Sequence, residues 1–99
     1  MILEFTGDIW YWRGPAPFYF VTVPETEARQ IKEMERMVTY GWGMIPVTAT
    51  VGKTKWTTSL WPKDGLYVLP LKVVVRRAEK LEEGQLVAVR LEVGDELNA

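Results

Sequence analysis

The amino-acid sequence predicts a mainly β fold of the α+β type, in which about six strands form a small closed or partly closed barrel with two short helices. Several segments alternate apolar and polar residues with the period of a half-buried strand. Tight-turn signals separate these segments, and only two stretches show helical spacing. Many short strands joined by tight turns favour a closed or partly closed barrel, because closure removes exposed strand edges.

The first half of the chain predicts a hairpin and then a helix. Residues 3–11 alternate as a strand, and Gly7 on its apolar face indicates a bulge or a bend. Residues 13–17 break this strand, and residues 18–23 are its expected hairpin partner. Pro24 then suits the first position of a helix. The apolar stripe of that helix is formed by Ala28, Ile31, Met34 and Val38.

The second half predicts strands at residues 45–51, 55–61, 66–69 and 86–93, with a helix before the last of them. Residues 70–80 are ambiguous, because the run Val73-Val74-Val75 has strand propensity. The opposing signal is a helical face shared by Leu71, Val74, Val75 and Ala78. Because Pro70 also suits a helix start, we predict a helix over residues 70–80.

Length and composition limit the classes of function. The chain has 99 residues, so we predict one domain over residues 1–96 and a short tail over residues 97–99. It contains no Cys and no His, which removes disulfides, thiolate ligands and the usual zinc sites and nucleophile–base pairs. We therefore favour a protein that is not an enzyme and that uses no cofactor and no metal.

Charge and hydropathy place the protein in solution. No apolar stretch approaches the roughly 20 residues that span a bilayer, and residues 1–8 lack a signal-type apolar run. We expect a soluble, cytoplasmic protein that does not contact a membrane. A charged fraction of 25% with few Asn and Gln residues favours a thermophilic source.

The sequence resembles a small bacterial family of unknown function. The similarity rests on Gly41-Trp42-Gly43, Val47, Thr50-Val51-Gly52, Trp56, Thr58-Ser59-Leu60, Pro62, Gly65, Tyr67, Leu69-Pro70, Lys72, Val75-Arg76-Arg77-Ala78 and Gly84, with Trp10, Gly14-Pro15 and residues 20–24 before them. It implies a double-split-type barrel, related in architecture to swapped-hairpin transcription factors. Some members carry a bacteriocin-protection (YdeI/OmpD-associated) tail, which we do not expect in this chain. The resemblance implies no catalytic residues.

One candidate site is an anion groove. Thr58 and Ser59 on a strand, with Lys72 and Arg76 one helical turn apart, could hold a phosphate or carboxylate near the helix start. The same residues also fit a solvated helix face and the outer side of a strand.

A second candidate site is aromatic. It consists of Trp10, Trp12, Arg13, Trp42 and Trp61. Exposed rings of this kind stack on bases, sugars or a partner's side chains. The alternative is that they close a barrel end or pack under a helix.

Together these features predict a non-enzymatic binding or interaction module. Its groove is expected to contain Thr58, Ser59, Lys72, Arg76 and one or more Trp residues, for which Trp10 and Trp42 are the candidates. The expected partner is a small anionic ligand or another protein. The alternative is association with nucleic acid, which rests only on the barrel analogy and gains nothing from a net charge of −1. The sequence leaves the oligomeric state open.

Overall fold

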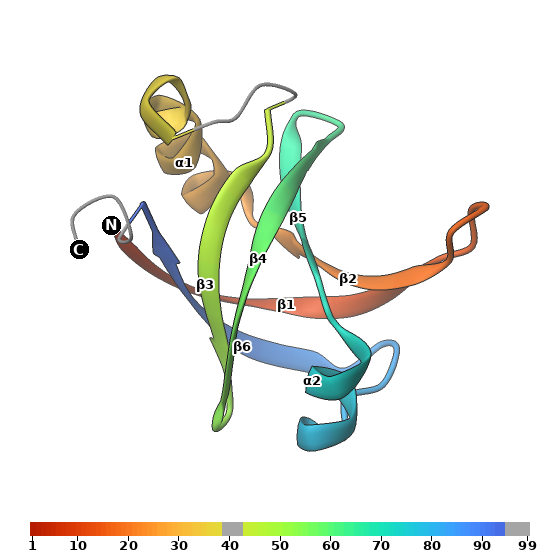
Figure 1. The fold of residues 1–99 in the computed structure, drawn as a ribbon. Helices are drawn as coiled ribbons and strands as arrows, with labels where there is room; N and C mark the ends of the chain where they lie inside the picture. The colour runs from red at the N-terminus through yellow and green to blue at the C-terminus, as the bar shows by residue number, and fades with distance from the viewer. Residues whose placement is uncertain (39–42, 95–99) are drawn as a thin grey trace.

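A computed structural model describes residues 1–38 and 43–94 (Figure 1). Its strands are β1 (Ile2–Trp12), β2 (Phe18–Val23), β3 (Ile45–Val51), β4 (Thr54–Lys63), β5 (Leu66–Pro70) and β6 (Leu86–Val93). Its helices are α1 (Glu25–Val38) and α2 (Val73–Glu79). Within these residues, the strands form a closed antiparallel barrel in the order β1-β2-β5-β4-β3-β6. The predicted mainly β barrel with two short helices is confirmed. The predicted tail, residues 97–99, lies outside the described residues.

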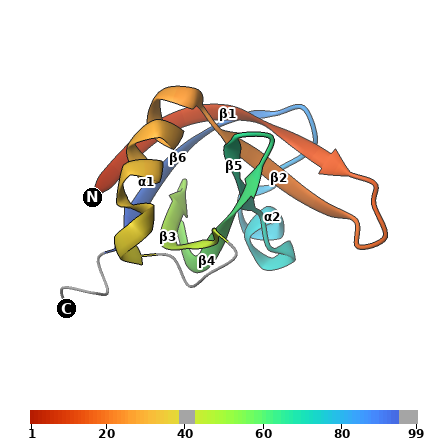
Figure 2. The ribbon, with the colours of Figure 1, turned by 90° about the horizontal axis from the view of Figure 1, so that it is seen from above.

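Two strands bend so that each belongs to both halves of the barrel wall. β1 pairs with β6 over residues 2–8 and with β2 over residues 9–12. β4 pairs with β3 over residues 54–60 and with β5 over residues 61–63. These changes of partner turn the sheet through two corners and close the barrel. Beyond its corner, β1 continues with β2 as a hairpin that extends past the barrel wall (Figures 1 and 2).

Gly7 lies immediately before the corner of β1, in agreement with the predicted bend. A Cβ atom at this position would lie 2.8 Å from Val21 Cγ1 and 3.3 Å from the Thr22 carbonyl oxygen. Val21 is fully buried and β-branched, so its side chain has little freedom to move aside. The absence of a side chain at Gly7 therefore allows β2 to pack closely on β1.

The Gly7→Ala variant tests this close approach. We expect it to lower the free energy of unfolding by about 1–3 kcal/mol, because the added methyl group overpacks a rigid part of the wall. Urea denaturation measures the change. Thr6→Ala, at the neighbouring exposed position, serves as the control and is expected to change stability by less than about 0.5 kcal/mol. Equal stability of the two variants would contradict the packing.

The core fills the barrel and extends under both helices. Inward-pointing residues alternate along each strand, and the largest fully buried ones include Ile9, Ile45, Leu60, Leu69 and Leu91. α1 packs on β3 and β5. α2 packs on β4 at the opposite end of these strands, near the turn that joins β3 to β4 (Figure 1). In the described part of the chain, neither helix combines the length and the apolar character that a membrane crossing requires.

The predicted helix over residues 70–80 is wrong at its start. β5 continues through Pro70, and the N–H of Leu71 donates to the carbonyl oxygen of Tyr19 at 2.9 Å. Lys72 has extended backbone angles, so the helix begins only at Val73. The predicted apolar face is also wrong, since Leu71 and Val75 are buried but Val74 and Ala78 are exposed. Sheet pairing, rather than helical spacing, sets the direction of Leu71.

A carboxylate joins α2 to the β3–β4 hairpin. Glu79 accepts hydrogen bonds from the Lys53 backbone N–H at 3.2 Å and from the Thr54 hydroxyl at 2.6 Å. Gly52 opens the two-residue turn with a φ of 59°, as the first residue of a type II′ turn requires. Because α2 follows β5 directly, this contact fixes the end of the helix relative to β4.

Candidate binding face

Aromatic side chains cover part of the barrel's outer surface. In the β1–β2 hairpin, Trp10 lies opposite Phe20 and Trp12 lies opposite Phe18, which places all four on one side. Phe20 lies opposite Pro70 of β5, and Val68, two residues before Pro70, lies opposite Trp61 of β4. The same register therefore brings Trp61 to this side. We call Trp10, Trp12, Phe18, Phe20 and Trp61 the aromatic face.

Phe20 lies at the centre of the aromatic face. Its ring centroid is 5.2 Å from that of Trp10, 5.4 Å from Trp61, 5.7 Å from Phe18 and 6.4 Å from Trp12. These separations are typical of favourable tilted and edge-to-face ring pairs. Phe20 is only 1% exposed although it points away from the barrel core, whereas Trp12 is 41% and Trp61 39% exposed. The aromatic face is thus a second hydrophobic cluster with two rings open to solvent.

Two hollows border the aromatic face, and Trp61 lines both. The first has a volume of about 190 Å³ and is lined by Trp10, Trp12, Phe20, Trp61, Pro62, Lys63 and Val68. The second has a volume of about 290 Å³ and is lined by Ala16, Pro17, Phe18, Thr58, Trp61, Pro70 and Lys72. Both linings are mainly apolar. Each contains one lysine, and neither contains a carboxylate.

The lysines give this region a positive character. Within the described residues, Lys72 makes no ion pair. Lys63 lies 3.4 Å from the carboxylate of its neighbour Asp64, but both side chains are solvent-exposed. Exposed pairs of this kind contribute little, so a ligand can compete for Lys63.

The structure brings together only some of the predicted site residues. Thr58 and Lys72 line the second hollow, and Trp10 lines the first. Ser59, the next residue on β4, lines neither hollow. Trp42 lies outside the described residues.

Arg76 lines neither of the two hollows that border the aromatic face. Its guanidinium carbon lies 4.0 Å from the ring centroid of Tyr19, on the opposite side of the hairpin from the aromatic face, and its Nε atom is buried. Tyr19 contacts Tyr11 at 4.7 Å between ring centroids, and Arg13 lies over Tyr11 at 5.4 Å. This stacking holds α2 against the hairpin. Arg76 therefore supports the position of α2 and is not a lining residue of the hollow that contains Lys72.

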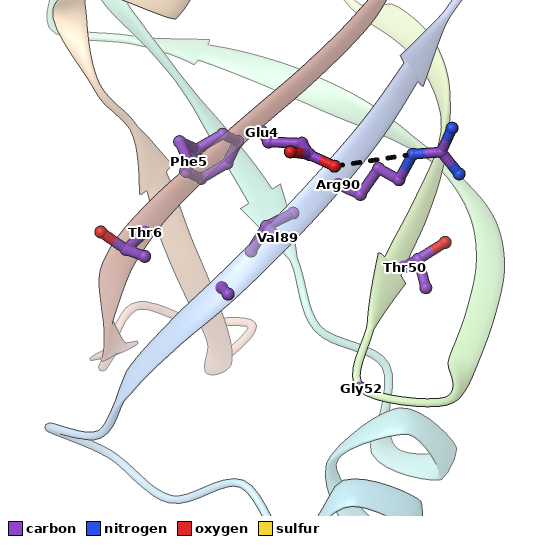
Figure 3. A pocket seen from close by; sticks show the side chains of 8 residues that line it. Glu4, Phe5, Thr6, Thr50, Gly52, Val89 and Arg90 are labelled. Atoms are coloured by element: carbon purple, nitrogen blue, oxygen red, sulfur yellow. Dashed lines mark ion pairs between the residues drawn. The ribbon is translucent and has the colours of Figure 1, made fainter.

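A larger hollow of about 510 Å³ crosses β6 between β1 and β3 (Figure 3). Its two charged lining residues already pair with each other, since Arg90 lies 3.9 Å from the Glu4 carboxylate. Arg90 also lies 3.9 Å from the carboxylate of Glu92, outside the lining. Glu4, Thr6 and Arg90 lie on the exposed side of their strands. This hollow has the features of a solvated sheet surface. In the described residues, no group of three or more acidic side chains could hold a metal ion.

Comparison with known proteins assigns the chain to a family. The sequence profile of DUF1905, a domain of unknown function, matches residues 5–91. The chain belongs to the DUF1905 family. No curated protein matches the chain. The match confirms the resemblance to a family of unknown function, and it runs from within β1 to within β6 of this DUF1905 domain.

Sequence reasoning missed the central residue of the aromatic face of this DUF1905 domain. Phe20 was expected only as part of a hairpin strand, as was Phe18. The break at residues 13–17 could have indicated that these phenylalanines lie beside the tryptophans. A hairpin with its turn at this break aligns Trp12 with Phe18 and Trp10 with Phe20. No signal in the sequence placed Trp61 beside Phe20, since that contact depends on β5 lying between β2 and β4.

Proposed function

We propose that this DUF1905 domain is a non-enzymatic binding module whose binding surface is the aromatic face with its two hollows. The observation that carries the proposal is that Trp61 lines two mainly apolar hollows, each of which contains a lysine and no carboxylate. Pockets that combine apolar walls with a few polar groups are the usual form of a binding site.

The aromatic face is suited to binding because its rings are already held in place. Trp10 donates its indole N–H to the Thr22 hydroxyl at 2.9 Å, and Phe20 supports Trp12 and Trp61 from below. A ligand that covers Trp12 and Trp61 removes apolar surface from water without first ordering these side chains. Tryptophan is also the residue type most often found at the energetic centre of an interface.

The lysines define the charge of the ligand. Lys63 and Lys72 favour a molecule that joins an apolar or ring-bearing part to an acidic group. At the second hollow, the Thr58 hydroxyl and the Lys72 ammonium are a hydrogen-bonding group and a charge for that acid. The proposed anion site thus includes Thr58 and Lys72 of the predicted groove and omits Ser59 and Arg76.

Association with nucleic acid is the alternative function and would use the same rings to stack on bases. Such binding depends mainly on neutralising phosphates. A domain with a net charge of −1 and one lysine in each hollow offers little of that charge. The apolar linings therefore favour an amphipathic acidic ligand.

The dye 8-anilinonaphthalene-1-sulfonate tests the proposal because it carries aromatic rings and one sulfonate. We expect a saturable rise in dye fluorescence with the native domain. Trp61→Ala should weaken binding by about tenfold or more, since it removes the wall common to both hollows. Val74→Ala, which truncates an exposed side chain on α2, is the control and should bind as the native protein does. Equal affinity in the native domain and the Trp61→Ala variant would refute the proposal.

A further inference from the structure

The shape of the aromatic face indicates what kind of ligand covers it. Trp61 is the one residue common to the linings of the two hollows, which also include the rings of other Trp, Phe and Pro residues. A ligand that fills both hollows must present two apolar groups on one side and leave a gap for the Trp61 ring. A single small ring fills only one hollow.

A polyproline II segment meets this requirement. It has three residues per turn and a rise of about 3.1 Å per residue, so apolar groups recur on one side roughly every 9 Å with a groove between them. Proline rings pack well on aromatic side chains, and the segment loses little conformational entropy on binding. Its carbonyl groups are free to accept hydrogen bonds, and the indole N–H of Trp61 donates to no other described residue.

The charges select among such segments. The lysines lie in different hollows, Lys63 beside Trp10 and Trp12, and Lys72 beside Phe18 and Pro70. With no carboxylate in either lining, acidic residues on both sides of a proline-rich core match this distribution.

We propose that the aromatic face binds a proline-rich segment of another protein in the polyproline II conformation, with acidic residues on both sides of the prolines. This inference rests on the proposed function and specifies its ligand. The segment lies across Trp61 with one apolar group in each hollow, and its acidic ends contact Lys63 and Lys72.

The test uses a synthetic peptide with a Pro-Pro-Leu-Pro-Pro core and two glutamates at each end. Its binding is followed through the tryptophan indole N–H signals in ¹H–¹⁵N NMR spectra of the full chain. We expect the signals of Trp12 and Trp61 to move, while that of Trp56, which is buried in the core, stays in place. Trp61→Ala should weaken binding by about tenfold or more. Glycine in place of every proline should also weaken it strongly, because the preformed conformation is lost.

A charge reversal tests whether the two lysines contact the acidic ends of the peptide, and it leaves the residues of the aromatic face unchanged. The double variant Lys63→Glu with Lys72→Glu changes two exposed side chains, so the fold is expected to be retained. We expect it to bind the glutamate-flanked peptide more weakly than the native domain, and to bind a lysine-flanked version of the peptide more tightly. Equal binding of the two peptides by the native domain would overturn the proposed charge selection.

Three outcomes separate this inference from the proposed function. If the dye binds at Trp61 but the peptide moves neither indole signal, the peptide inference fails and the binding face stands. If a twelve-residue oligothymidylate binds more tightly than the peptide at the same salt concentration, the partner is nucleic acid and the inference is overturned. If the dye binds equally well to the Trp61→Ala variant, the proposed function itself fails.

Discussion

The Phe20→Ala variant is expected to lose about 3–5 kcal/mol of unfolding free energy. Phe20 is almost fully buried and contacts four aromatic rings, so its removal leaves a cavity that stiff, bulky neighbours cannot fill. Small domains have a total stability of about 5–15 kcal/mol, so the loss is a large part of the whole. Urea denaturation followed by tryptophan fluorescence measures it.

Phe20→Leu is the matched variant for this prediction. Leucine fills most of the space that the phenyl ring occupies, and we expect it to restore a large part of the stability that alanine loses. The same variants report on binding, because Trp12 and Trp61 lose their support when Phe20 is truncated. A loss below about 1 kcal/mol in Phe20→Ala would show that the aromatic face is not a packed cluster.

The Leu60→Ala variant is expected to lose about 2–5 kcal/mol of unfolding free energy. Leu60 is fully buried in the barrel core and lies opposite Ile45, at the last position where β4 pairs with β3. The following residue, Trp61, already pairs with β5. Truncation at this corner removes apolar contacts where the wall bends, and thermal and urea denaturation measure the loss.

Leu86→Ala deletes the same atoms from a different environment. Leu86 begins β6 and is 64% exposed, so its truncation should change stability by less than about 0.5 kcal/mol. The difference between the two leucine variants isolates the effect of burial from that of strand propensity. If Leu60→Ala and Leu86→Ala have similar stability, the core position of Leu60 is wrong.

Much of the fold could be predicted from local pattern. The break at residues 13–17 predicted the bounds of β2, the Thr- and Val-rich composition those of β3, and alternation those of β6. The helical stripe with Ala28 and Ile31 predicted α1. Such signals are strong because a residue's neighbours in sequence determine which side of a strand or helix it occupies. The segment before α2 was predicted incorrectly, because Leu71 is held extended by a hydrogen bond to Tyr19, which lies far from it in sequence.

The candidate site was predicted only in part, because its residues also make contacts with residues far from them in sequence. The exposure of Trp12 follows from its place on the polar side of β1, which sequence alternation indicates. Lys72 and Arg76 were paired by helical spacing, yet Lys72 precedes the helix and Arg76 stacks on Tyr19. Spacing along the chain is a guide to contact only when both residues belong to the same regular element.

The sequence by itself determined the mainly β class, most strand bounds, the turns and the absence of Cys and His chemistry. Each of these depends on residue type or on neighbours a few positions apart. Only the tertiary structure decided that Phe20 is buried outside the barrel core and that Trp61 lines two hollows, one with Lys63 and one with Lys72. Those contacts depend on the order β1-β2-β5-β4 around the barrel, which brings together residues about forty positions apart through the pairing of whole strands.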